Sequence, residues 1–217
     1  ILTGESGVGK SVLIKTLLES LKERKGVSTI FLNFSAQTKA KDVQLAIESK
    51  LIKKGKTLFG ARPLEKICVF IDDVNMPALE FYGAQPCIEL LRQLVDLGGL
   101  YDRHKLFFKD VVDTTLIPVC GPPGGGRNQL SFRFLRQLLP LMFPTPSSST
   151  AFKIFNSLLA PKCSYSKPIV LTTLQVFEKI SRELLPTPSK FQYIYNMRDV
   201  GKVIENIGKG KDRKSTR

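Results

Sequence analysis

The residues best suited to chemistry form a glycine-rich loop near the start of the chain. They match the phosphate-loop (Walker A) pattern G-x-x-x-x-G-K-[ST] without a mismatch. In that pattern the backbone N–H groups surround phosphate oxygens, the lysine reaches the β and γ phosphates, and the hydroxyl ligates magnesium. The residues are Gly4, Glu5, Ser6, Gly7, Val8, Gly9, Lys10 and Ser11. They predict a site for ATP or ADP with Mg²⁺; the alternative is a glycine-rich turn with a chance Lys-Ser.

A pair of acids supplies the second part of such a site. Residues 67–71 (ICVFI) form an unbroken apolar run, the pattern of a strand covered on both faces, and Asp72 and Asp73 follow it. Asp72 is the candidate metal ligand, and Asp73 is the candidate catalytic acid that polarises the attacking water. Many ATPases of this architecture carry glutamate there; an aspartate carboxylate sits about 1.5 Å back, and such misplacement can cost about 100-fold in rate. We therefore expect binding with slow turnover, unless these acids merely end a strand in a solvated turn.

Alternating strands and helices must position these residues. Apolar side chains at helical spacing predict helices, and short β-rich runs predict strands. The helices are expected at 13–21, 42–53 and 86–97, the strands at 28–34, 67–71, 114–120 and 138–143, and an inserted hairpin near 106–112. This order predicts an α/β domain.

The chain changes character near residue 146. Residues 144–149 (PTPSSS) have the composition of a linker, and the pattern beyond them is helical near 151–159, 170–184 and 197–207. We therefore divide the chain into a large α/β nucleotide-binding subdomain at 1–146, a helical lid subdomain at 150–208 and a basic, disordered tail at 209–217.

Composition further restricts the classes of function and partner that fit this chain. The 217 residues carry 33 Lys and Arg against 19 Asp and Glu, a formal charge of +14 that favours acidic partners such as nucleotides. The four cysteines, Cys68, Cys87, Cys120 and Cys163, lack C-x-x-C spacing, so we expect buried thiols in a reducing compartment and no zinc site. No apolar run approaches the roughly 20 residues of a membrane helix, so no membrane partner is expected.

Five strings, in order along the chain, resemble the third AAA+ module of an axonemal dynein heavy chain, and the match runs from Ile1 to about Ile207. The strings are NFSAQT at 33–38, DDVNMP at 72–77, YGAQP at 82–86, IELLRQ at 88–93 and GPPGGGRN at 121–128. The resemblance implies a P-loop AAA+ fold: a parallel five-stranded sheet of order 5-1-4-3-2, its first strand truncated, flanked by helices and followed by a small α-helical lid. It also implies one segment of a six-module ring that drives ciliary sliding along microtubules.

The same resemblance assigns roles to three arginines. Arg198 matches the lid arginine that senses the γ-phosphate of the module's own nucleotide; the alternative is a helix-start arginine paired with Asp199. Arg133 and Arg136 fall where this family places an arginine finger, which serves the site of the neighbouring module. The alternative for that pair is a basic helix face, and the choice between the two arginines stays open.

Two departures from the family favour a regulatory or slow ATPase site. The polar sensor of typical modules would fall near Gly121, which has no side chain, and Asn128 would replace it only if its loop folds back. Asp73 stands in place of glutamate. The implied cofactors are ATP or ADP and Mg²⁺. The implied partners are neighbouring AAA+ modules, other dynein subunits and, indirectly, microtubules, in the cytoplasm and cytoskeleton of a ciliary or flagellar axoneme.

Two alternatives remain at this stage. One is a truncated, non-functional remnant: residues 1–3 read as the end of a strand, too short to satisfy both neighbours, which predicts weak nucleotide binding and aggregation. The other is a P-loop ATPase that acts on nucleic acid, which the positive charge would suit. The basic residues are interspersed with acids and the chain has no tryptophan, so we expect no nucleic-acid partner.

Overall fold

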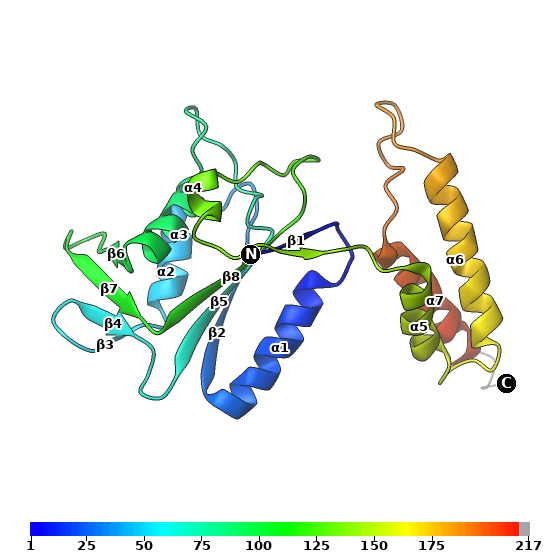
Figure 1. The fold of residues 1–217 in the computed structure, drawn as a ribbon, viewed down its shortest axis with the longest axis horizontal. Coiled ribbons are helices and arrows are strands. Elements are labelled where there is room, and N and C mark those ends of the chain that lie inside the picture. Colours follow the sequence, from blue (N-terminus) through cyan, green and yellow to red (C-terminus); the bar gives the residue numbers. More distant parts are fainter. Residues whose placement is uncertain (213–217) are drawn as a thin grey trace. The chain divides into compact units, whose positions relative to one another are not determined.

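The computed structural model describes residues 1–212; residues 213–217, the end of the tail expected at 209–217, lie outside the described residues. Two compact units make up the chain (Figure 1). The first comprises Ile1–Glu5 and Gly9–Phe143, and the second comprises the residues from Pro144 onward together with Ser6–Val8.

The first unit is built on a parallel five-stranded sheet. Its strands are β1 (Leu2–Gly4), β2 (Val27–Asn33), β5 (Lys66–Asp72), β8 (Thr114–Cys120) and β9 (Leu141–Phe143). They lie in the order β9-β1-β8-β5-β2. Counted along the chain these are strands 5-1-4-3-2, so the predicted topology is confirmed. The first strand has three residues, and it pairs with both β8 and β9.

Helices cover the two faces of this sheet (Figure 1). The pleat of β5 sends alternate side chains to opposite faces. Phe70 packs with Leu18 of α1 (Lys10–Lys25), whereas Ile71 belongs to the core that contains α2 (Ala40–Glu48) and α3 (Pro86–Asp96). Each such side chain, once fully buried, stabilises the fold by about 1.5–3 kcal/mol. These contacts fix α1 and β5, the two elements that carry the candidate site.

A second sheet, of four strands, was only partly foreseen. It contains β3 (Ile52–Lys53), β4 (Leu58–Gly60), β6 (Gly99–Tyr101) and β7 (Phe108–Val112), in the order β3-β4-β7-β6. The helix expected at 42–53 was wrong at its end, because α2 stops at Glu48 and Ile52 pairs with Gly60 across β4. Pairing with a distant strand outweighs the helical spacing there. The hairpin is confirmed at β6 and β7, and it begins earlier than residue 106.

The second unit is helical and has its own core. Its helices are α5 (Ser148–Leu159), α6 (Ser166–Glu183) and α7 (Met197–Asp212). They bury Phe155, Leu159 and Val170 against one another. The tail expected from residue 209 was wrong for its first four residues, because α7 continues through Asp212. Ile204 remains buried near the end of this helix, and Lys209 pairs with Glu205 at 2.6 Å, so both packing and charge extend it.

Candidate nucleotide-binding site

The phosphate-loop residues lie between a strand and a helix, as the motif requires. β1 ends at Gly4 and α1 begins at Lys10, with a turn at residues 5–9. Gly9 is the N-cap, with a φ of 93° that side chains disfavour. The first turn of α1 contains no acidic residue and no side chain caps it. The N–H groups and the positive end of the helix dipole can therefore face an anion.

Lys10 is a buried cation at this helix start. Its side chain is 8% exposed, and its Nζ donates to the main-chain oxygens of Gly4 and Glu5, each at 2.7 Å. Burial lowers the pKa of Lys10, the nearby Cys120 and the carboxylates of Asp73 and Asp72 oppose that shift, and the guanidinium of Arg127 adds to it. The ammonium has a third N–H to offer, and its two partners are neutral carbonyls. It is placed to bind an anion such as a phosphate.

The two acids lie at the carboxyl end of β5. The main-chain oxygen of Asp72 accepts from Phe34 N at 3.0 Å, and Val74 N donates to Val119 O of β8 at 3.0 Å. Hydrogen bonds therefore hold the backbone on both sides of Asp73. Asp73 turns the chain there, with a φ of 51°, and its N–H donates to Asp72 Oδ1 at 3.2 Å. Ligands of open parallel sheets bind at this edge. Lys10, at the N-terminus of α1, lies close enough to Asp72 and Asp73 for both carboxylates to oppose the lowering of its pKa.

The loop after β8 folds back over the same edge. Asn75 Nδ2 donates to Gly121 O at 2.9 Å, and Asn128 Nδ2 donates to Pro77 O at 2.8 Å. Folding back was the condition for Asn128 to replace the missing sensor; the loop meets it, but the Asn128 amide donates to Pro77 O. Arg127 is the loop residue that reaches the acids: its Nε lies 3.5 Å from Asp73 Oδ1. Sequence reasoning missed Arg127, although it is the one charged side chain in residues 121–128.

Mg²⁺ and a nucleotide suit the residues present. Magnesium prefers oxygen ligands and is commonly held by one or two protein groups together with substrate phosphates. The Ser11 hydroxyl at the start of α1 and the Asp72 carboxylate at the end of β5 are such groups. Within residues 1–212 no cluster of three or more His, Cys, Asp or Glu side chains is placed to hold a metal alone. The phosphates of a nucleotide would complete this donor set, next to the buried ammonium of Lys10.

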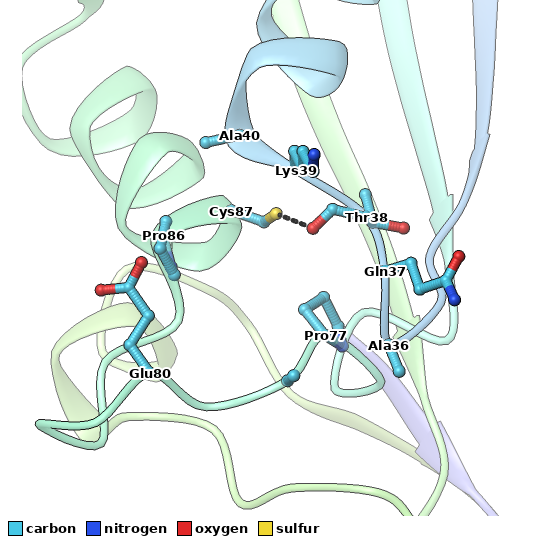
Figure 2. Close-up of a pocket in the computed structure, with 10 residues that line it drawn as sticks. Ala36, Gln37, Thr38, Lys39, Ala40, Pro77, Glu80, Pro86 and Cys87 are labelled. Carbon is cyan, nitrogen blue, oxygen red and sulfur yellow. Dashed lines mark hydrogen bonds between the residues drawn. The ribbon is translucent and has the colours of Figure 1, made fainter.

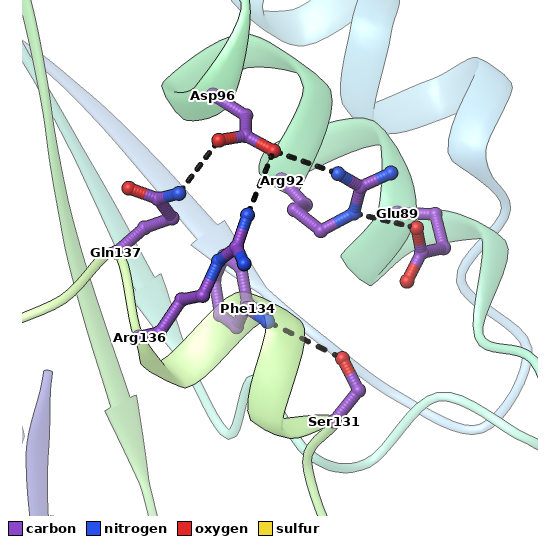
Figure 3. Close-up of polar contacts among 7 residues, drawn as sticks. All are labelled: Glu89, Arg92, Asp96, Ser131, Phe134, Arg136 and Gln137. Atoms are coloured by element: carbon purple, nitrogen blue, oxygen red, sulfur yellow. Dashed lines mark hydrogen bonds and ion pairs between the residues drawn. The ribbon is translucent and has the colours of Figure 1, made fainter.

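Of the candidate finger arginines, Arg133 lies on a short helix, α4 (Phe132–Leu135), and Arg136 is the C-cap residue of that helix. Phe134 is fully buried and anchors it, and Ser131 caps it by accepting from Phe134 N at 3.4 Å. Arg136 is drawn toward Asp96 of α3, with 3.9 Å between the charged atoms (Figure 3). Arg133 is exposed, and no ion pair to it is found within residues 1–212. Both arginines are therefore on the surface of the first unit.

Arg198 lies in the second unit, at the start of α7. Its side chain is exposed, and its N–H donates to Asn196 Oδ1 at 2.8 Å. The pairing with Asp199 that we considered is not found among the described residues; Asp199 instead lies 3.7 Å from Lys202 and accepts from Asn196 N. The role of Arg198 toward a nucleotide stays a prediction.

A separate hollow of about 600 Å³ lies beside the start of α2. Figure 2 shows Cys87 of α3 and Thr38 meeting there, and the thiol donates to Thr38 O at 3.0 Å. Burial raises the pKa of the Cys87 thiol. None of the predicted site residues lines this hollow. It is therefore distinct from the phosphate loop, and its cysteine is held as a neutral thiol.

Comparison with known proteins agrees with the fold. The family model that describes a P-loop containing dynein motor region matches residues 1–146, two thirds of the chain and all of the elements that carry the phosphate loop and the acids. The chain belongs to this dynein motor family.

Several axonemal heavy chains are similar to this motor region over nearly its whole length. Dynein axonemal heavy chain 6 of Homo sapiens is 45% identical over 95% of the chain, dynein axonemal heavy chain 12 of Mus musculus is 40% identical over 94%, and the dynein-1-beta heavy chain of the flagellar inner arm I1 complex of Chlamydomonas reinhardtii is 37% identical over 95%. The chain spans only 5%, 7% and 5% of these relatives, respectively. Across the part of the chain that the structure describes, no helix combines the length and apolar character needed to cross a membrane.

Proposed function

We propose that this dynein motor region is a nucleotide-binding module that takes up Mg·ATP or Mg·ADP at its phosphate loop and hydrolyses ATP slowly or not at all. The observation that carries the proposal is the buried Lys10 ammonium, which lies at the N-terminus of α1 within electrostatic reach of Asp72 and Asp73. A buried cation at a helix N-terminus, with two carboxylates nearby, suits the binding of Mg²⁺-bound phosphates.

Each residue has a distinct task. Lys10 binds phosphate oxygens together with the N–H groups of the loop, and Ser11 and Asp72 hold Mg²⁺, which when bound neutralises charge on the phosphates. Asp73 is the group available to orient and polarise a water. Its carboxylate is one methylene shorter than the glutamate that many ATPases of this architecture carry there, so it is short for that task. Gly121, at the expected place of the polar sensor, offers no side chain. Both features favour a regulatory site over a fast ATPase.

The relatives suggest the assembly in which the module works. We place it as the third AAA+ module of an axonemal heavy chain, in contact with neighbouring modules and other dynein subunits, and acting on microtubules only indirectly. Arg133 and Arg136 then serve the nucleotide of an adjacent module. Arg133 is the better finger candidate, because Asp96 attracts Arg136. Arg198 would sense the γ-phosphate of the module's own nucleotide.

Phosphate release under saturating Mg·ATP tests the slow-site proposal. The full chain is expected to bind Mg·ATP in a calorimeter and to release phosphate more slowly than about 1 per second, near the low end of typical enzyme turnover. Asp73→Glu, which restores the longer carboxylate, is expected to raise the rate. A wild-type rate above that limit would contradict a regulatory site, and a folded chain that binds no nucleotide would contradict the whole proposal.

A further inference from the structure

Arg127 is presented to the site by a tight turn. Gly124, Gly125 and Gly126 have positive φ values of 121°, 57° and 85°, a combination that only glycine adopts readily. Gly124 and Arg127 close the turn with two main-chain hydrogen bonds, of 2.9 and 3.1 Å. The next residue, Asn128, is tied to Asn75 by its N–H at 2.9 Å. Because both ends of the turn are fixed, the Arg127 side chain is directed toward Asp73.

Gly121 lies directly against the Arg127 side chain. A Cβ added at Gly121 would lie 2.9 Å from Arg127 Nε, closer than such atoms approach, and 3.2 Å from its Cζ, closer than in most such contacts. The conformation of Gly121 itself does not require glycine, since its φ is outside the left-handed range. The missing side chain at the sensor position therefore makes room for the guanidinium. The guanidinium of Arg127 occupies space that a side chain at residue 121 would fill.

The guanidinium is close to the phosphate-binding groups and has unused hydrogen-bonding capacity. Its charge contributes to the lowered pKa of Lys10, so the two cations are within electrostatic reach of each other. Its Nε is buried, yet it has no hydrogen-bond partner among the residues that the structure describes. The Asp73 carboxylate is 46% exposed and 3.5 Å away, a loose contact for a charged pair. A planar, permanently charged fork in this place suits phosphate oxygens.

We propose that Arg127 binds the terminal phosphate of a nucleoside triphosphate, exchanging Asp73 for phosphate oxygens, and so makes the site prefer ATP to ADP. The inference rests on the proposed function of the phosphate loop and adds a discriminating residue to it. Loss of Arg127 weakens triphosphate binding in two ways, because a cation disappears and Asp73 is left as an uncompensated negative charge. A diphosphate, which ends one phosphate earlier, is much less affected.

Calorimetric titration of the full chain with a non-hydrolysable β,γ-imido ATP analogue and with ADP, both with Mg²⁺, tests the inference. Arg127→Ala is expected to weaken analogue binding about 10-fold or more and to change ADP binding by less than about 2-fold. Arg127→Lys, which keeps the charge but not the fork, should lose less. Arg103→Ala removes an exposed arginine from the β6–β7 turn and should leave both affinities unchanged.

Gly121→Ala provides an independent variant. The added methyl group displaces only the flexible end of Arg127, so the fold should survive while the triphosphate preference falls as it does in Arg127→Ala. Combining the two substitutions should cause no further loss, because the second removes a contact already broken. An unchanged ratio of analogue to ADP affinity in Arg127→Ala, or equal losses for both nucleotides, would overturn the inference while the phosphate-loop proposal stands. A wild-type chain that binds neither nucleotide would overturn both.

Discussion

Phe134→Ala is expected to destabilise the first unit strongly, because this one side chain anchors the helix that carries the candidate finger arginines. Phe134 is fully buried in the core that also contains Leu91 and Leu94 of α3. Removing a buried phenylalanine ring costs about 3–5 kcal/mol, the sum of lost burial and the cavity left behind. At roughly 2–4 °C per kcal/mol for a domain of this size, the melting temperature should fall by about 6–20 °C.

The neighbouring ring gives a matched control. Phe132 lies two residues earlier in the same short helix and is 77% exposed, so Phe132→Ala should change stability by less than about 0.5 kcal/mol. Thermal unfolding followed by circular dichroism, supported by urea titration, measures both variants. Equal effects of the two substitutions, or a fall of less than about 1 kcal/mol for Phe134→Ala, would refute the assignment of α4 as a docked element.

Three further outcomes follow from the contacts. Main-chain N–H donors of the β6–β7 turn, together with Lys109, hold the pKa of Asp102 well below its usual value. The stability that Asp102 adds is therefore present above about pH 4 and is lost as the pH falls below it. The difference in melting temperature between wild type and Asp102→Ala should shrink over that range. Cys87 is buried and its thiol has a raised pKa, so it should resist alkylation by iodoacetamide at neutral pH until denaturant is added. Peptide mass spectrometry measures the alkylation. Rapid alkylation of the native chain would contradict the burial of Cys87. Arg133→Ala and Arg136→Ala should each leave the Mg·ATP affinity of the isolated chain within about 2-fold, since a finger serves another module's site; calorimetry checks this.

The sequence allowed a more complete prediction of the fold than of the candidate site. The sheet order was predicted from the resemblance that the five strings carry, and the alternation of strands and helices predicted the α/β domain. Apart from its hairpin, the second sheet was not predicted, because its strands are two to five residues long and are stabilised by distant partners. Ile52, placed in a helix by its spacing, pairs with Gly60 instead.

Arg127 could not be identified from local patterns. A glycine-rich loop indicates irregular structure, but where it folds depends on side chains elsewhere, such as Asn75, which holds Gly121 O at 2.9 Å. The sensor was expected from a side chain at or near Gly121, and the sequence indicated only that none was present. The close approach of Arg127 to both Gly121 and Asp73 became visible only once the loop was placed on the sheet edge.

Equilibrium binding of Mg·ATP to the full chain and to Lys10→Ala tests the central claim most directly. Lys10 is buried at the loop, so its loss should weaken binding about 10- to 100-fold, the range for a hydrogen bond to a charged group. Lys22→Ala removes an exposed lysine from the same helix and should leave the affinity unchanged. Equal affinities for wild type and Lys10→Ala, in chains with matching circular dichroism spectra, would contradict the account.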